Sequence, residues 1–161
     1  MNFGIFFSPF ERKMGPPNNK KLVSTFVQST ICGLLLAIVV DHTMKKGDLL
    51  QPNCQARDEF HSLDQFYSYY LCEHSLPITK LFHFMATFNA TIFLMMILGA
   101  KSTSTKLRIF VFTLFQAYGL AWISHFWLEK NKPATFKYPI YSFACDWIMF
   151  KDALFGRVSL F

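Results

Sequence analysis

The sequence predicts an all-α protein of the integral membrane class, a helical bundle with about three transmembrane helices. The first observation is composition: 52% of the 161 residues are hydrophobic and 18% are aromatic, whereas only 16% are charged. Soluble domains carry charge on about a quarter of their residues. The second observation is that the apolar residues gather in three long uncharged runs. Such a chain has more apolar surface than one small soluble core can bury, which indicates lipid as its solvent.

The three uncharged runs are each close to the roughly 20 residues that a helix needs to cross a bilayer. They occupy residues 22–40, 81–100 and 109–128. The polar link between the second and third runs is short, so these two helices are expected to form an antiparallel hairpin. Residues 1–21 form a basic, proline-broken leader, for which a mitochondrial targeting segment and an interfacial foot both stay open.

The segment "ARDEFHSLDQFYSYYLCEHS", residues 56–75, predicts an amphipathic helix lying at the membrane surface. Its apolar side chains recur at steps of three and four residues, and this stripe ends on His74. Asn53 is the expected N-cap. Asp58 and Glu59 are expected in the first turn, where the helix dipole favours acidic side chains.

The last apolar stretch, residues 138–150, holds Asp146 and has too few residues to cross a bilayer as a helix. It is expected to form a short re-entrant or interfacial segment. No nucleotide-binding glycine motif and no nucleophile elbow occurs in the sequence.

The charge pattern also favours a membrane protein. The formal net charge is +6, and the basic residues form short clusters beside the apolar runs. Such clusters are typical of membrane-edge anchors, and their distribution argues against nucleic acid as a partner. No two of the four cysteines form a C-x-x-C pair, so neither a disulfide framework nor a zinc knuckle is expected. Small buried apolar side chains are the expected role of the cysteines.

Three of the five histidines are expected to meet at one membrane edge. His83 lies 17 residues before Ala100, and His125 lies 19 residues after Lys106. At the helical rise, both imidazoles lie about 25 to 28 Å from the hairpin turn. His74 ends the surface helix that leads into the same edge.

Neutral imidazole is the commonest metal ligand in proteins, and three of them with a nearby carboxylate suit non-haem iron(II) or zinc. The candidate carboxylates are Glu129, one helical turn after His125, then Asp146 and Glu73. A second interpretation stays open at this point, because interfacial histidines often only cap helices or contact lipid headgroups.

Two stretches around these residues resemble a known family. They are "FYSYYLCEHSLPITKLFHFMATF" (66–88) and "YGLAWISHFWLEKNKPATFKYPIYSFACDWIMFKDALFGR" (118–157). Together they are similar to the small membrane proteins that include the fungal 2-hydroxy fatty acid dioxygenase, over about residues 60–157. The run "HFWLEKNKPATFKYP" is the most specific part of the likeness.

The resemblance implies a membrane protein that oxidises 2-hydroxy fatty acids with O2 and shortens them by one carbon. It implies iron(II) bound by His74, His83 and His125, with Glu129 and Asp146 as catalytic residues. The chain departs from the family pattern at two places that affect close packing. Ser124 stands where glycine is usual, and Ala144 and Cys145 replace a glycine-containing pair.

The resemblance also divides the chain. Residues 1–55 would be a leader plus an extra transmembrane helix, and residues 56–161 a dioxygenase-like membrane domain. The expected partners are membrane lipids, a 2-hydroxy fatty acid and other membrane subunits. The expected location is the endoplasmic reticulum, or the mitochondrial inner membrane for a complex subunit.

Two alternatives to the enzyme stay open from the sequence. One is a non-catalytic subunit of a large membrane assembly, such as a mitochondrial respiratory complex, in which the fold serves as a scaffold and iron is kept or lost. The other is a protein that binds lipid without chemistry. In each case the N-terminus is expected on the membrane side opposite the histidines.

Overall fold

The computed structural model describes residues 19–43, 54 and 59–161, and this part of the chain is helical and contains no strands. The expectations for the leader up to residue 18, for Asn53 and for Asp58 lie outside the described residues. The predicted all-α class is confirmed. In chain order the helices are α1 (Asn19–Thr43), α2 (Leu63–Glu73), α3 (Pro77–Gly99), α4 (Thr103–Ile123), the π-helix η2 (Ser124–Glu129), the 3₁₀ helix η3 (Ala134–Phe136) and α5 (Pro139–Leu154).

Three helical segments are long and apolar enough to cross a membrane: α1, α3, and α4 continued by η2. They correspond to the three predicted runs. Large apolar side chains stay exposed on their outer faces, among them Leu35, Leu98 and Phe115. Such faces suit helices whose backbone polar groups are satisfied internally and whose side chains contact lipid.

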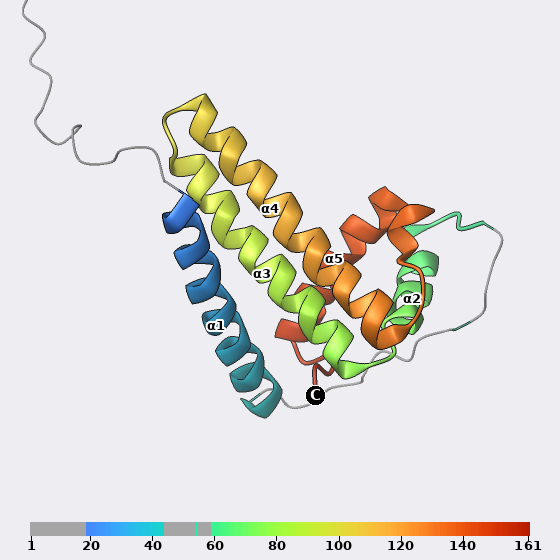
Figure 1. Ribbon diagram of the computed structural model, residues 1–161. Coiled ribbons are helices and arrows are strands. Elements are labelled where there is room, and N and C mark those ends of the chain that lie inside the picture. Colours follow the sequence, from blue (N-terminus) through green and yellow to red (C-terminus); the bar gives the residue numbers. More distant parts are fainter. Residues whose placement is uncertain (1–18, 44–53, 55–58) are drawn as a thin grey trace, which may run out of the picture.

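Helices α3 and α4 form the expected antiparallel hairpin, and α1 lies along α3 with its N-terminal end beside the hairpin turn (Figure 1). Helices α1 and α3 approach closely at Gly33 of α1, where an added Cβ would lie 2.9 Å from Cδ1 of Phe88 on α3. Close to this contact, the Asn89 amide donates a hydrogen bond of 2.9 Å to the Thr30 hydroxyl. Small residues and single polar bridges are the usual means of joining helices in a bilayer.

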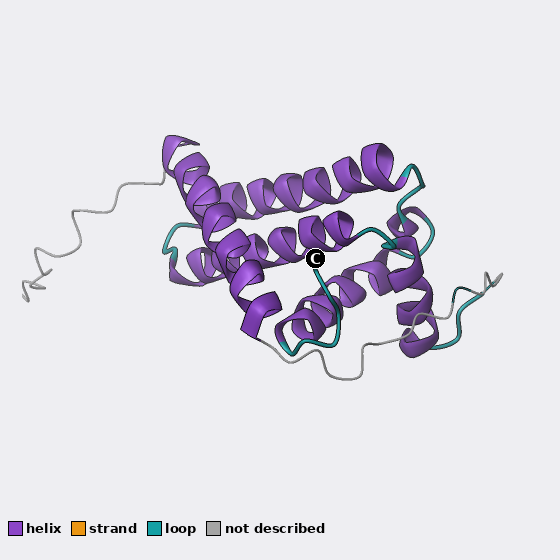
Figure 2. Ribbon diagram, turned by 90° about the horizontal axis from the view of Figure 1, so that it is seen from below, coloured by secondary structure: helices purple, strands orange, loops and turns teal. Residues whose placement is uncertain are grey.

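Helices α2 and α5 pack together at the end of the hairpin where α3 begins (Figures 1 and 2). Phe66 and Tyr70 of α2 are buried against Cys145 and Met149 of α5. The Tyr67 hydroxyl adds a hydrogen bond of 3.0 Å to Asp152. This second layer covers the start of α3, which is where the functional side chains gather.

The surface helix begins later than the sequence predicts. Helix α2 starts at Leu63 and not at residue 56, because Ser62 caps it: its hydroxyl accepts a hydrogen bond of 3.3 Å from the Gln65 backbone N–H. Glu59 therefore precedes the helix and is not in its first turn, where Asp64 is the acidic residue. A serine followed three residues later by glutamine is a common helix-start signal.

The expectation that the cysteines form no disulfide is wrong for one pair. Cys54 and Cys72 are joined by a disulfide across 18 residues, which ties the segment before α2 to the last turn of that helix. Such a pair gives no short sequence motif, because the two cysteines meet only after α2 has formed. Cys145 is a buried free thiol, and its burial raises its pKa to about 12, with a contribution from neighbouring Asp146. Cys32 is exposed on α1.

The C-terminal apolar stretch forms α5, 16 residues long, with Pro139 in its first turn. This length is below that of a membrane-crossing helix, as predicted. The residues that follow return to α1, where Leu160 is buried in one cluster with Ala37. The Ser159 hydroxyl donates to Asp41 of α1 at 3.4 Å. Helix α1 is therefore packed against both the hairpin and the C-terminal segment.

Candidate metal centre

His74 stands at the C-cap of α2, where the helix ends three residues before Pro77. Its ring is buried and stacks on the Tyr70 ring, with centroids 4.0 Å apart. Nδ1 lies 2.6 Å from the Tyr70 carbonyl oxygen one turn earlier. A carbonyl can only accept, so Nδ1 carries the proton and Nε2 is left with its lone pair.

His83 lies in the second turn of α3 and is buried. Its Nδ1 lies 2.7 Å from the Asp146 carboxylate of α5. The Tyr70 hydroxyl lies 3.2 Å from the same Nδ1 and donates a short hydrogen bond to the same carboxylate oxygen. Asp146 therefore accepts from both groups, which again places the imidazole proton on Nδ1 and leaves Nε2 unprotonated.

His125 is positioned by the π-helix η2 and by the turn that follows it. The π-helix ends at Lys130, whose left-handed φ of 58° reverses the chain and whose N–H bonds to the His125 carbonyl. The reversal brings the Asn131 side-chain oxygen to 2.8 Å from His125 Nδ1. The Asn131 amide group faces two acceptors of Glu73, its carbonyl and its carboxylate, at 3.1 and 3.0 Å. Its oxygen therefore faces the imidazole and accepts from Nδ1.

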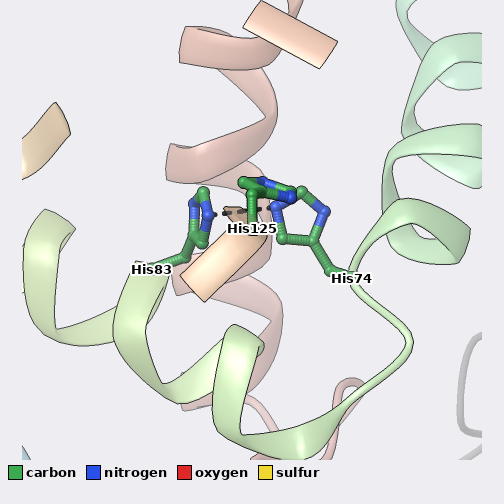
Figure 3. Close-up of side chains that lie close together, drawn as sticks. All are labelled: His74, His83 and His125. Atoms are coloured by element: carbon green, nitrogen blue, oxygen red, sulfur yellow. Dashed lines mark hydrogen bonds between the residues drawn. The ribbon is translucent and has the colours of Figure 1, made fainter. Parts of the chain in front are cut away.

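The three rings converge on one point (Figure 3). One ring nitrogen of each of His74, His83 and His125 lies within 4.8 Å of the others. The Nε2 atoms of His74 and His83 are only 3.1 Å apart. The outer hydrogen bonds place each proton on Nδ1, so the inward nitrogens all present lone pairs. Lone pairs that face each other in a buried site repel, and a shared cation removes that repulsion.

The pKa shifts of the buried groups favour the neutral imidazoles that a metal ion binds. Burial, reinforced by neighbouring His83 and His125, lowers the pKa of His74 well below its ordinary value. His74 is therefore neutral at physiological pH, which is the form that binds metals. Burial and the Asp146 carboxylate raise the pKa of Tyr70 well above its ordinary value, so its hydroxyl stays a donor.

The chemistry of the donors fits a divalent metal that accepts nitrogen ligands. Three neutral imidazoles without cysteine or a clustered carboxylate suit iron(II) or zinc, with room for further ligands. Each histidine also has the outer hydrogen-bond partner that metal-binding imidazoles usually have.

The sequence-predicted carboxylates lie in different places. Asp146 contacts His83 through its carboxylate. Glu129 contacts the connection between α2 and α3: its carboxylate accepts from the Leu76 backbone N–H at 2.8 Å and from the Ser75 hydroxyl at 3.0 Å. Glu73 contacts Asn131 and no histidine ring.

Two residues that orient the rings were missed by the sequence reasoning as site residues. In the sequence, Tyr70 is one residue of the predicted helix 56–75, and Asn131 is one residue of the run "HFWLEKNKPATFKYP" that carries the resemblance. The "N-x-P" turn after Glu129 is the one signal that could have singled out Asn131, because a polar residue before a helix-breaking proline often bonds locally.

The fold and the site define a class: a helical membrane protein with a buried three-histidine centre at the edge of a hairpin. Within that class the chain belongs to the family described as "2-hydroxy-palmitic acid dioxygenase Mpo1-like", which it matches over residues 60–158. The matched segment contains all three histidines and Asp146. Comparisons with curated proteins and with solved structures gave no match.

Proposed function

We propose that the protein is a membrane-bound, iron(II)-dependent dioxygenase of 2-hydroxy fatty acids. The observation that carries the proposal is the convergence of three buried histidines whose Nδ1 atoms are all held by outer acceptors. Family membership supplies the substrate class, since the family is named for the oxidation of 2-hydroxy-palmitic acid.

The protein's own residues have separate tasks in this proposal. His74, His83 and His125 hold the metal, and Asp146 orients His83 and balances the positive charge of the site. Tyr70 keeps the Asp146 carboxylate in place by donating to it. Iron(II), when bound, supplies the redox chemistry with O2. Overall, a 2-hydroxy acid and O2 would give the acid one carbon shorter, CO2 and water, a reaction in which all atoms balance.

The location of the site suits such a substrate. The histidines lie near one end of the membrane-crossing segments, since His83 is in the second turn of α3 and His125 follows the last turn of α4. A fatty acid in a bilayer keeps its carboxylate at the interface and its chain among the lipids. The reacting carbon next to the carboxylate would therefore lie at the depth of the histidines.

The test is to purify the protein without oxygen, measure its iron, and then follow O2 uptake with 2-hydroxyhexadecanoic acid. Hexadecanoic acid, which lacks the hydroxyl, is the substrate control. We expect stoichiometric iron and uptake with the hydroxy acid alone. His125→Ala should lose both iron and uptake, whereas the exposed His42→Ala and His61→Ala should keep both.

Two results would contradict the proposal in different ways. Iron binding without O2 uptake would support a lipid-binding protein that retains the centre. A protein that takes up no metal would support the alternative of a non-catalytic subunit of a larger membrane complex, for which copurification of other subunits is the corresponding measurement. The endoplasmic reticulum is the location that we propose for the enzyme, from the resemblance.

A further inference from the structure

A cavity of about 120 Å³ lies beside the histidine centre, between α3, α4 and α5. His83, His125 and Asp146 form one end of its lining. The lining continues to Ala90 on α3 and to Thr113 on α4. At the helical rise these positions lie about 10 and 18 Å along the helices from the histidines. The cavity is therefore elongated and runs from the candidate metal centre toward the middle of the membrane-crossing segments.

The cavity exists because small side chains line both helices of the hairpin. Ala86 and Ala90 on α3, and Ala117 and Ala121 on α4, all contribute to its wall. In each pair the residues are four apart and share one helix face. Four methyl groups at these positions leave space that larger apolar residues would fill, and their surface suits an alkyl chain.

The same cavity is bounded by side chains that face the outside of the bundle. Leu114 and Tyr118 of α4 are 41% and 38% exposed, and Phe143 of α5 is 63% exposed. Leu114 and Tyr118 belong to a segment that is long and apolar enough to cross a membrane. A lipid chain can therefore enter sideways, between α4 and α5, without passing through water.

The volume limits what the cavity can hold. An engineered cavity of about 150 Å³ in another protein binds one benzene molecule. The present cavity is somewhat smaller, so it holds only a short length of an acyl chain. The remainder of a long chain has to lie outside, among the lipids that cover α4.

We propose that this cavity is a lateral acyl groove, in which Ala86, Ala90, Ala117 and Ala121 accommodate the carbons next to the head of a 2-hydroxy fatty acid. The inference rests on the proposed function for the identity of the ligand. It adds two properties. The groove excludes acids that carry a ring or a large branch near the carboxylate, whereas a single bromine atom still fits, and it tolerates different chain lengths because the tail leaves the protein.

Trp147 provides a direct measurement, because it lines the same cavity. In a Trp122→Phe, Trp127→Phe background it is the only tryptophan left of the three. Bromine quenches indole fluorescence only at short range. We expect a 2-hydroxy fatty acid with bromine close to its carboxylate to quench Trp147, and one with bromine at its methyl end to quench it far less. The measurement is made on iron-loaded protein without oxygen, so that no turnover occurs.

Filling the groove should remove binding. Ala117→Phe and Ala90→Phe are each expected to weaken binding of the quenching acid at least tenfold, while iron content stays unchanged. Met95→Phe is the matched control, because Met95 is 63% exposed on α3 and does not line the cavity. Ala117→Leu replaces the phenylalanine variant if that variant does not load iron. Unbrominated acids of different chain length should displace the probe with affinities within a few-fold of one another.

The inference and the proposed function fail in distinguishable ways. Equal quenching by both brominated acids, undiminished binding to the filled variants, or strong discrimination by chain length would each overturn the groove, whether or not the protein is an oxygenase. Specific quenching that the filled variants abolish, together with no O2 uptake, would leave the groove standing and overturn the oxygenase.

Discussion

The three histidine rings are oriented by acceptors from three separate segments: a carbonyl of α2, a carboxylate of α5 and an amide of the turn after η2. The orientation of all three rings therefore depends on contacts from segments that are far apart in the sequence. Each acceptor fixes one ring tautomer, and only the combination leaves three lone pairs that face one point. The centre is therefore a property of the tertiary structure, although its ligands can be found from the sequence.

Asp146 is the outer contact with the largest expected effect. Asp146→Asn replaces the charged carboxylate that accepts hydrogen bonds from both His83 and Tyr70. We therefore expect the affinity for iron(II) to fall by about 10- to 100-fold, as for other outer partners of metal-binding histidines. Competition with a chelator measures the affinity, and circular dichroism checks the helices. Asp64→Asn, an exposed change on α2, should leave affinity unaltered. An unchanged affinity in Asp146→Asn would show that Asp146 does not orient a ligand.

Glu129 allows its two possible roles to be separated. If it acts through its bonds to Leu76 and Ser75, Glu129→Gln should keep stoichiometric iron, because the amide oxygen can still accept from the Leu76 N–H. Glu129→Ala should lower the free energy of unfolding by about 1 kcal/mol, the usual net contribution of a hydrogen bond, again with iron retained. Thermal unfolding and metal analysis measure the two effects. Loss of iron in the glutamine variant would instead identify Glu129 as a ligand.

Sequence reasoning placed the histidines correctly at one edge because the rise of a helix is constant, so residue counts from the hairpin turn convert directly into depth. The same reasoning placed Glu129 on the face of His125, since residues four apart share a face in an α-helix. The chain forms a π-helix there, with backbone hydrogen bonds between residues five apart, so residues four apart no longer share a face. Tyr70 contributes through its contacts with His83 and Asp146, which no local pattern reveals, whereas Asn131 reaches His125 within one local turn.

At the level of helices, α1 meets α3 at the close contact of Gly33 with Phe88 and at the hydrogen bond between Thr30 and Asn89. Helix α1 precedes the residues that match the family, 60–158. The proposed division of the chain at residue 55 places α1 outside the metal-binding part. Its attachment can therefore be disturbed without touching the histidines.

Gly33→Leu tests this attachment. A Cβ at Gly33 would lie 2.9 Å from the Phe88 ring, so the ring or the two helices must shift. We expect the free energy of unfolding in detergent to fall by about 1 to 3 kcal/mol, as for other overpacked sites. Gly119→Leu is the matched control, because no atom lies within 4 Å of a Cβ at that position. Iron content should be unchanged in both; loss of iron in Gly33→Leu would show that α1 supports the centre.

At the scale of the whole molecule, the three membrane-crossing segments were predictable because a bilayer requires long uncharged runs, and such runs are visible in any sequence. The arrangement of α2, α5 and the C-terminal residues could not be predicted from the sequence, because it depends on which buried faces meet. The Cys54–Cys72 disulfide could not be predicted for the same reason. It joins residues that only the folded chain brings together.

The positive charges at the two ends of the bundle and the disulfide bear on its orientation in the membrane. Lys20 and Lys21 begin α1, and Lys101, Lys106 and Arg108 surround the hairpin turn, so these cations share one end of the bundle (Figure 1). Excess lysine and arginine favour the cytoplasmic side of a membrane, but these residues are about equally numerous at the other end, which holds Lys80, Lys130, Lys132, Lys137, Lys151 and Arg157, so they do not set the orientation. The disulfide and the histidine centre lie at the opposite end, and disulfides persist in oxidising compartments such as the lumen of the endoplasmic reticulum. The disulfide therefore carries the expected orientation.

We therefore expect the hairpin turn in the cytosol and the histidine centre at the lumenal edge. In sealed microsomes, an impermeant maleimide should label Phe10→Cys and Thr103→Cys directly. It should label Lys132→Cys, in the turn after η2, only after permeabilisation, because three crossings separate the leader from Lys132. Each variant is made in a Cys32→Ser background, since Cys145 is buried and the remaining two cysteines are bonded to each other. Opposite compartments for residues 10 and 103 would exclude this topology, whereas the same labelling pattern inverted would keep the three crossings and reverse the orientation.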